Sequence, residues 1–222
     1  MIRIIGTHHL MKEKEIEKEI DKFNPEIVLV ELCNGRITLI EHPELIPKAK
    51  FSLLRLIVES IKKKAEKENV VYGQDMISVY QISKKRGIKV GLIDRPMVET
   101  KILFGAIPLR EKLVFLKQLI SFSSKKVKVK DIINEIDNME IQKVLNQIKS
   151  KCPEFFYYII TSRDEYMVNK IKGYLYDYPD KKILAFVGKG HVDKIKKEVF
   201  KREGYEKLLR EEKWKEVKTE WT

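Results

Sequence analysis

The chain has 222 residues, of which 43% are hydrophobic and 35% are charged. This length and hydrophobic content are enough for one domain with a sizeable core, and they exclude a disordered chain. The net charge of +12 admits an anionic partner. The lysines, however, are spread over many expected helices without clusters of aromatic residues, so nucleic acid is not the expected partner.

Neither a targeting segment nor a membrane span is expected. The first residues, MIRIIGTHH, predict a strand rather than a signal peptide, and no stretch reaches about 18 uninterrupted apolar residues. The two cysteines, Cys33 and Cys152, do not form a C-x-x-C pair, so they indicate neither a zinc ribbon nor a disulfide framework. We therefore expect a cytoplasmic chain without a transmembrane segment, while membrane association through residues beyond this chain stays open.

The amino-terminal residues predict one βαβ unit. Residues 2–5 predict a short strand that stops at Gly6. Residues 12–23 show the apolar spacing of an amphipathic helix. The next run, residues 27–32, is apolar except for Glu31, which is typical of a strand buried on both faces of a parallel sheet.

Two more strands are expected further along the chain. A long helix is expected from Ser52, and a shorter helix is expected from about Asp75, a typical N-cap residue, to Gly87. The apolar runs at residues 88–94 and 182–188 then predict the third and fourth strands, because each ends directly in polar or glycine residues.

Residues from about 97 to 178 are predicted to be almost wholly helical. Asp131 is a candidate N-cap within this region, and the stretch SSKKVKVK is its most exposed linker. A last helix is expected from about Val192. The predicted plan is an α/β fold: a mostly parallel central sheet with flanking helices and a helical insertion or cap, all within one domain spanning residues 1–222.

Polar residues are expected at the end of every predicted strand. Two strands run into a Gly-x-x-His sequence, first GTHH and then GKGH, and ligands of open α/β sheets bind at the carboxyl ends of the strands. The expected site therefore lies at one edge of the sheet, with the two histidines within direct or metal-bridged distance. It consists of His9, Glu31, Asp94, Arg95, Arg163 and His191.

This set of residues allows two interpretations. A charge inside an apolar strand, such as that of Glu31, is costly unless it is paired or bound to a metal. Two imidazoles and a carboxylate suit a divalent ion with open positions for water, and a second carboxylate could act as a general base. In the structural interpretation, Glu31 forms a buried ion pair with Arg95 and Asp94 forms a turn. Arg163 then caps its helix or pairs locally with Asp164 or Glu165.

Five motifs of the chain occur in the order found in the TraB/PrgY family: GTHH, NPEIVLVELCNGR, YGQDMISVYQISKKRGIKVGLIDRP, SRDEYM and ILAFVGKGHV. The chain therefore resembles this family, which is related to the TIKI metalloproteases and, more distantly, to heme-binding ChaN-like and erythromycin-esterase-like proteins. The match runs from the first strand to about residue 200, apart from the variable helical insertion.

The resemblance implies metal-dependent hydrolysis of peptides, with the paired Gly-x-x-His motifs at the centre. It implies His9, Glu31 and His191 as ligands of a divalent metal, which would be Mn, Co or Zn. The strand-end pattern and the resemblance together give four catalytic candidates, Glu31, Asp94, Arg95 and Arg163. They also give six ligand-binding candidates, Gly6, Arg36, Gly73, Asp75, Gly188 and Gly190.

Two positions depart from the usual pattern of the family. Ser162 stands where a Glu usually precedes the Arg163-Asp164 pair, and Asp75 stands where Glu is common. If either longer carboxylate were needed for catalysis, the protein would bind a peptide or small molecule, as in pheromone shutdown, without cleaving it. A non-catalytic binding protein is therefore the alternative hypothesis, and assembly into a homo-oligomer stays open.

Overall fold

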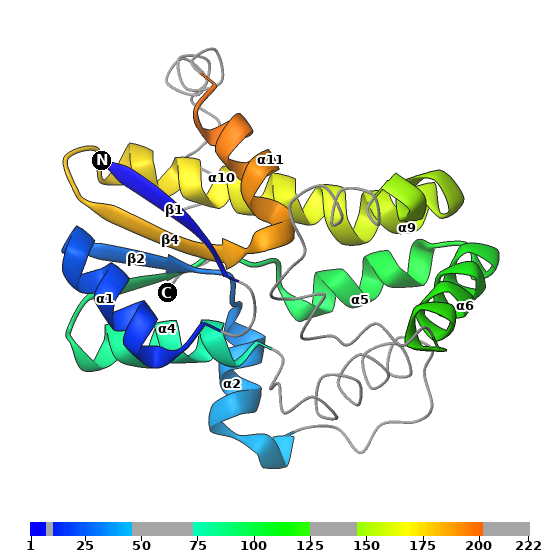
Figure 1. Ribbon diagram of the computed structural model, residues 1–222, viewed down its shortest axis with the longest axis horizontal. Coiled ribbons are helices and arrows are strands. Elements are labelled where there is room, and N and C mark those ends of the chain that lie inside the picture. The colour runs from blue at the N-terminus through cyan, green and yellow to red at the C-terminus, as the bar shows by residue number, and fades with distance from the viewer. Residues whose placement is uncertain (8–10, 46–72, 125–145, 202–222) are drawn as a thin grey trace.

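The computed structural model describes residues 1–7, 11–45, 73–124 and 146–201, and these contain a four-stranded sheet. The strands are β1 (Ile2–Thr7), β2 (Ile27–Val30), β3 (Lys89–Leu92) and β4 (Ile183–Gly188). All pairs are parallel, and the order across the sheet is β1-β4-β2-β3. The predicted α/β fold with a mostly parallel central sheet is therefore confirmed (Figure 1).

The two central strands, β2 and β4, are the most apolar ones. Every residue of both strands is buried, because helices cover the sheet on both faces. A strand covered on both sides loses the alternation of apolar and polar residues and becomes a continuous apolar run. This explains why β2 and β4 are easily recognised in the sequence.

The strand register brings all four carboxyl ends to the same edge of the sheet. Thr7 at the end of β1 pairs with Gly188 at the end of β4. Val30 at the end of β2 pairs with Phe186 of β4 and with Leu92 of β3. Any residue that directly follows β2 or β3 therefore lies at this carboxyl edge.

Two helices pack on each face of the sheet (Figure 1). Helices α1 (Glu13–Phe23) and α4 (Gln74–Lys85) cover one face, where Ile16, Val79 and Phe186 share a buried cluster. Helices α10 (Ser162–Asp177) and α11 (Lys189–Val199) cover the other face. The cluster on that face contains Met167 and Ile195.

The helix boundaries near the amino terminus agree with the sequence in part. Ile16 and Ile20 are the buried residues of α1, as their spacing predicts. Gly87 follows α4 with a φ of 69°, as expected for the residue after a helix. The prediction that Asp75 caps α4 is wrong, because the N-cap is Gly73, with a φ of 80°, and Asp75 lies in the first turn.

The remaining described helices lie after β2 and between β3 and β4. They are α2 (Asn34–Glu41), the 3-10 turn η1 (Pro43–Leu45), α5 (Met97–Ala106), α6 (Leu109–Ser124), α9 (Pro153–Phe156) and the π-helical turn η2 (Tyr157–Thr161). Residues 146–151 are also helical. The helical character of residues 97–178 is thus confirmed where it is described. The helix from Ser52, the cap Asp131 and most of the linker SSKKVKVK lie outside the described residues.

Helices α5, α6 and α9 form a separate group beyond the carboxyl edge of the sheet (Figure 1). Its core contains Phe104, Ile107 and Phe155, and the ring of Phe115 stacks on Phe155 with centroids 4.0 Å apart. Helix α10 continues from this group along the sheet, where Met167 is fully buried. The helical group therefore borders the edge at which the strand ends meet.

The expected end of β1 at Gly6 is wrong, since the strand continues to Thr7. Gly6 instead permits close packing between β1 and α11. A Cβ atom at this position would lie 2.6 Å from the Cγ2 of Val192. The glycine is therefore explained by the contact between a strand and a helix, and not by a turn.

A second close approach, at Gly91 of β3, gives a testable prediction. A Cβ at this position would lie 2.5 Å from Cζ of Tyr174 and 2.6 Å from Cδ2 of Leu29. Because both neighbours belong to the packed core, we expect Gly91→Ala to lower the free energy of unfolding by about 1–3 kcal/mol in urea titrations. Gly105→Ala, where a Cβ meets nothing within 4 Å, is the control and should leave stability unchanged or raise it by less than about 1 kcal/mol.

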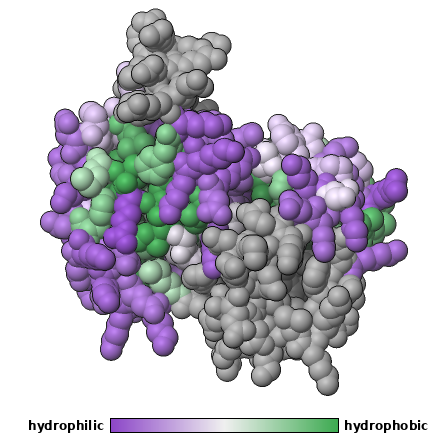
Figure 2. Space-filling view, turned by 45° about the horizontal axis from the view of Figure 1, so that its top comes forward, coloured by the Kyte–Doolittle hydropathy of each residue, from purple (hydrophilic) through white to green (hydrophobic). Residues whose placement is uncertain are grey.

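One face of the described part carries both hydrophilic and hydrophobic residues. Figure 2 shows charged and polar residues over most of one face, with a hydrophobic area between them. Within the described ranges, none of the helices combines the length and apolar character needed to cross a membrane.

Candidate functional site

Five polar side chains meet at the carboxyl edge of the sheet. Glu31 follows β2 directly, and Asp94 comes two residues after β3. His191 lies in the first turn of α11, which begins at the end of β4. Arg163 and Asp164 lie in the first turn of α10. The structure thus brings together Glu31, Asp94, Arg163 and His191, four of the six residues that the sequence assigned to the site.

Arg163 lies at the centre of this cluster. Its Nε donates to Oδ1 of Asp94 at 2.7 Å, and its Nη2 donates to Oδ2 of Asp94 at 2.9 Å. Nη2 also donates to Oε1 of Glu31 at 2.6 Å. The two carboxylates are 5% and 4% exposed. A planar guanidinium can bind one buried carboxylate through two parallel hydrogen bonds and a second carboxylate at the same time.

Glu31 is held from two sides. Its Oε2 accepts a hydrogen bond of 2.5 Å from the backbone N–H of Gly188, and its Oε1 is shared by Arg163 and His191. The Nε2 of His191 lies 3.8 Å from this Oε1 atom. The charge that interrupts the apolar run of β2 is therefore paired, as its burial requires.

His191 lies between two carboxylates. Its Nδ1–H donates to Oδ1 of Asp164, while Nε2 faces Glu31. Burial by itself lowers the pKa of His191, but the hydrogen bond to Asp164 and the charge of Glu31 outweigh burial, so the pKa is raised above its ordinary value. A histidine held in this way has a fixed ring orientation and one nitrogen directed at the centre of the site.

Asp94 has the opposite electrostatic balance. Burial by itself raises the pKa of Asp94, but the charge and hydrogen bonds of Arg163, together with the charge of Arg36, lower the pKa below its ordinary value. The Nη2 of Arg36 lies 3.6 Å from Oδ2 of Asp94, and its side chain is 44% exposed. The side chain of Arg36 therefore lies between the buried cluster and solvent.

The lowered pKa of Asp94 predicts loss of stability in acid. A carboxylate of this kind contributes stability that is present above the pKa of the unfolded chain and is lost as pH falls through the folded pKa. We expect the difference in free energy of unfolding between wild type and Asp94→Asn to be constant above about pH 5 and to shrink below about pH 4. Urea titrations at a series of pH values measure it, and a difference independent of pH would contradict the prediction.

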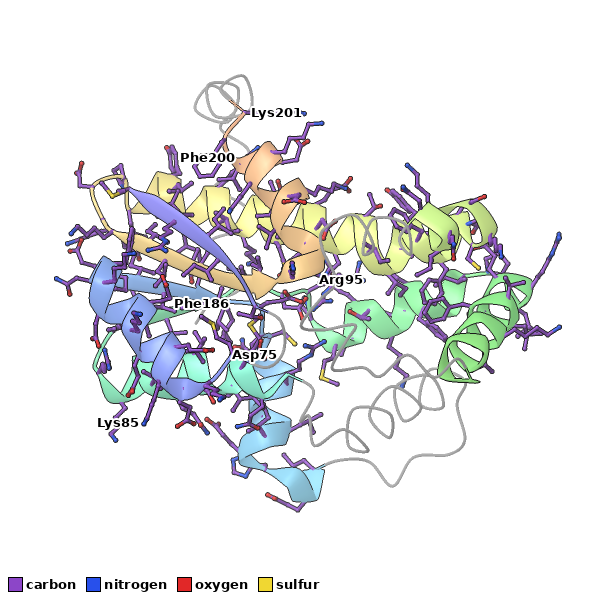
Figure 3. All side chains as sticks on the ribbon, in the orientation of Figure 1. Asp75, Lys85, Arg95, Phe186, Phe200 and Lys201 are labelled. Carbon is purple, nitrogen blue, oxygen red and sulfur yellow. The ribbon has the colours of Figure 1, made fainter. Side chains whose placement is uncertain are left out.

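Arg95 does not reach Glu31, in contrast to the sequence prediction. It is 3% exposed, and its guanidinium donates to Thr100, Ser162 and the carbonyl oxygen of Tyr158. Figure 3 shows Arg95 beyond the tips of the strands, beside the start of α5. The ion pair proposed between Glu31 and Arg95 is therefore wrong, and Arg163 is the partner of Glu31.

The other candidates lie around the start of two helices. Asp75 is buried in the first turn of α4 (Figure 3), and its Oδ1 accepts from the backbone N–H of Met76 at 2.9 Å. Gly73 and Gly190 have open space where a Cβ would be. Their roles in ligand binding, and that of Gly6, stay predictions. His9 lies outside the described residues, and so does its predicted approach to His191.

Asp164 is the site residue that the sequence did not single out. It was considered only as a local partner of Arg163, whereas the structure pairs it with His191. The signal was present in α10, where Asp164 shares a helical face with the buried Met167, Val168 and Ile171. A carboxylate at helical spacing on an apolar face needs a buried partner.

The donor set fits a divalent metal only in part. Among the described residues, no three His, Cys, Asp or Glu side chains come together as a metal-binding group. Oε1 of Glu31 and Nε2 of His191 face each other and could both bind a metal ion. Gly188 holds the other oxygen of Glu31, and Asp164 holds the other ring nitrogen of His191. These are ligand types that Mn, Co and Zn accept, and a third ligand is required.

The fold and the cluster define an α/β protein whose polar site lies at the carboxyl edge of a parallel sheet. A comparison with family models identifies it further. The chain belongs to the TraB/PrgY/gumN family, whose model matches residues 52–214. The matched range contains Asp94, Arg163 and His191 and begins after Glu31. The resemblance seen in the sequence motifs is therefore confirmed.

Among curated proteins, the chain is similar to the uncharacterized protein MJ1365 of Methanocaldococcus jannaschii. The two are 27% identical over 212 residues, which covers 87% of this chain and 52% of the relative. The chain thus spans about half the length of that relative. No solved structure matches the chain.

Proposed function

We propose that the protein is a metal-dependent hydrolase that acts on peptides, with its site at Glu31 and His191. The observation that supports this proposal is the position of His191 between Asp164 and Glu31. A carboxylate bound to one ring nitrogen of a histidine is the usual support of a metal-ligating histidine, because it fixes the tautomer and leaves the other nitrogen to the metal.

The proposed ligands are Nε2 of His191, Oε1 of Glu31 and a side-chain nitrogen of His9. The first two atoms lie 3.8 Å apart, while His9 belongs to the part of the chain that the structure does not describe. Mn, Co and Zn all accept such mixed nitrogen and oxygen ligands. When bound, the metal would lower the pKa of a water molecule and polarise the carbonyl group of a substrate.

The protein's own residues would position the reacting groups. Arg163 binds the carboxylates of Glu31 and Asp94 and fixes them in a buried site, where electrostatic interactions are stronger than in water. Asp164 holds the ring of His191. Arg36, half-exposed beside Asp94, is placed to bind a carboxylate or carbonyl oxygen of a peptide.

The proposal is tested by metal content and peptide turnover measured on the same preparations. We expect the wild type to bind one divalent ion and to cleave members of a fluorescence-quenched peptide library in the presence of Mn²⁺, Co²⁺ or Zn²⁺. His191→Ala should lose both properties. His42→Ala is the matched control, because His42 is exposed and pairs only with Glu44 in the described structure. Metal binding and turnover that persist in His191→Ala would refute the proposal.

One observation favours the alternative of a binding protein without catalysis. Both oxygens of Glu31 are already engaged, by Gly188 and by Arg163. On this alternative, Arg163 and Arg36 would hold a peptide or small-molecule ligand and nothing would be cleaved. Saturable binding of a peptide with no product after prolonged incubation with each of the three metals would support it, and turnover that is abolished by a chelator would exclude it.

A further inference from the structure

A π-helical turn lies directly before α10, whose second residue is Arg163. In η2 the backbone N–H of Ser162 donates to the carbonyl oxygen of Tyr157, five residues earlier. An α-helix would use the carbonyl four residues earlier instead. The extra residue in this turn rotates the helix that follows by about 100° relative to a continuous α-helix. The direction in which Arg163 points therefore depends on this turn.

Arg95 and Ser162 hold the turn from its side. The carbonyl oxygen of Tyr158, which the N–H of Ser162 would have used in an α-helix, accepts from Oγ of Ser162 at 2.8 Å and from Nη2 of Arg95 at 2.9 Å. Nη1 of Arg95 also donates to Oγ of Ser162 at 2.7 Å. Two side chains thus satisfy the carbonyl that the π-turn releases.

The contacts on the two chain segments are reciprocal. Asp94 and Arg95 are neighbours after β3, and Ser162 and Arg163 are neighbours at the start of α10. The carboxylate of Asp94 binds the guanidinium of Arg163, while the guanidinium of Arg95 binds Ser162. Oδ1 of Asp94 also accepts the backbone N–H of Arg95 at 2.8 Å.

The burial of Arg95 at this position is energetically unfavourable. It is 3% exposed, and the hydrogen-bond acceptors of its side chain are neutral oxygens of Thr100, Ser162 and Tyr158. Burial and the charge of Arg163 lower the pKa of Arg95, and they outweigh the charges of Asp94 and Glu99, which raise it. A buried cation without a carboxylate on its guanidinium is unfavourable for stability, so a role in positioning explains it better than a role in stability.

We propose that Arg95 and Ser162 are positioning residues, which fix the π-turn and so direct Arg163 at Glu31 and Asp94. The proposal concerns the geometry of the cluster and holds for metal-free protein. Only its consequence for turnover rests on the proposed hydrolase function. Neither Arg95 nor Ser162 contacts Glu31 or His191 through any hydrogen bond or ion pair in the described structure, so each acts through Arg163.

The test follows the side-chain Nε–H of Arg163 by NMR in metal-free, full-length protein. This proton is bound to Asp94, so its exchange with water reports how tightly Arg163 is held. We expect exchange at least about tenfold faster in Ser162→Ala and in Arg95→Gln, which corresponds to the loss of about one hydrogen bond to a charged group. Ser162→Thr, which keeps the hydroxyl, should restore the wild-type rate.

Glu111→Gln is the control for a merely structural effect. Glu111 binds the backbone N–H of Phe155 at 2.9 Å and thus holds α9 without contact to Arg163. The Glu111→Gln variant should leave the exchange rate of the Arg163 Nε–H proton unchanged. An unchanged rate in Ser162→Ala, or an equal acceleration in Glu111→Gln, would overturn the proposal. If Arg95→Gln does not fold, Ser162→Ala decides. The readout needs neither metal nor substrate, so failure of the proposed hydrolase is seen separately, in the metal and turnover assays.

Discussion

Arg163→Met is expected to lower the free energy of unfolding by about 3–5 kcal/mol. The variant keeps much of the apolar volume of Arg163 but leaves the buried carboxylates of Glu31 and Asp94 without their shared cation. Two like charges in a buried site then repel each other, which adds to the loss of hydrogen bonds. Urea unfolding monitored by circular dichroism at neutral pH measures the effect.

Arg86→Met is the matched control for this variant. Arg86 pairs with Glu17 and Asp21 at the surface, where an ion pair contributes no more than about 1 kcal/mol. A small effect of Arg86→Met beside a large effect of Arg163→Met is the expected pattern. If the two variants lose the same amount of stability, Arg163 is not the centre of the buried cluster.

Glu31→Gln is expected to reduce peptide turnover by about 10²–10⁴-fold, because it weakens the binding of a metal that would contribute several kcal/mol to transition-state stabilisation. The amide is close in size to the carboxylate and still offers an oxygen to Gly188, so the fold should be retained. It removes the charge that faces His191 and that the proposed metal requires.

Glu26→Gln is the control for Glu31→Gln. Glu26 is exposed and pairs with Lys181 at the opposite, amino-terminal end of β2, so its loss should leave turnover unchanged. Thermal unfolding of both variants checks that they are folded. Wild-type turnover in a folded Glu31→Gln variant would remove Glu31 from the proposed mechanism.

The sheet was predictable because the sequences of the two central strands are recognisable on their own. The apolar runs of β2 and β4 contain no alternation, and this indicates strands covered on both faces. Helical segments between them imply parallel pairing, which brings Glu31, Asp94 and the start of α11 to one edge. The boundaries were less predictable. The glycine at position 6 serves packing against Val192, a tertiary contact that a local pattern does not contain.

The partner of Glu31 was not predictable from strand ends alone. The buried charge indicated that a partner must exist, and both Arg95 and Arg163 were available. Arg95 is nearer to the strand ends in the sequence, yet the structure directs it to Ser162 and Tyr158. The π-turn rotates α10 so that Arg163 reaches Glu31 instead. A local change of helical hydrogen bonding of this kind has no signature in the apolar periodicity.

Anomalous diffraction from crystals grown with Mn²⁺ would show whether Glu31 and His191 bind a metal ion. We expect one anomalous peak within coordinating distance of Oε1 of Glu31 and Nε2 of His191, with Asp164 still bound to Nδ1, and no such peak in His191→Ala. The absence of a peak between these two atoms in the wild type, with Oε1 of Glu31 still bound to Arg163, would refute metal binding at this site.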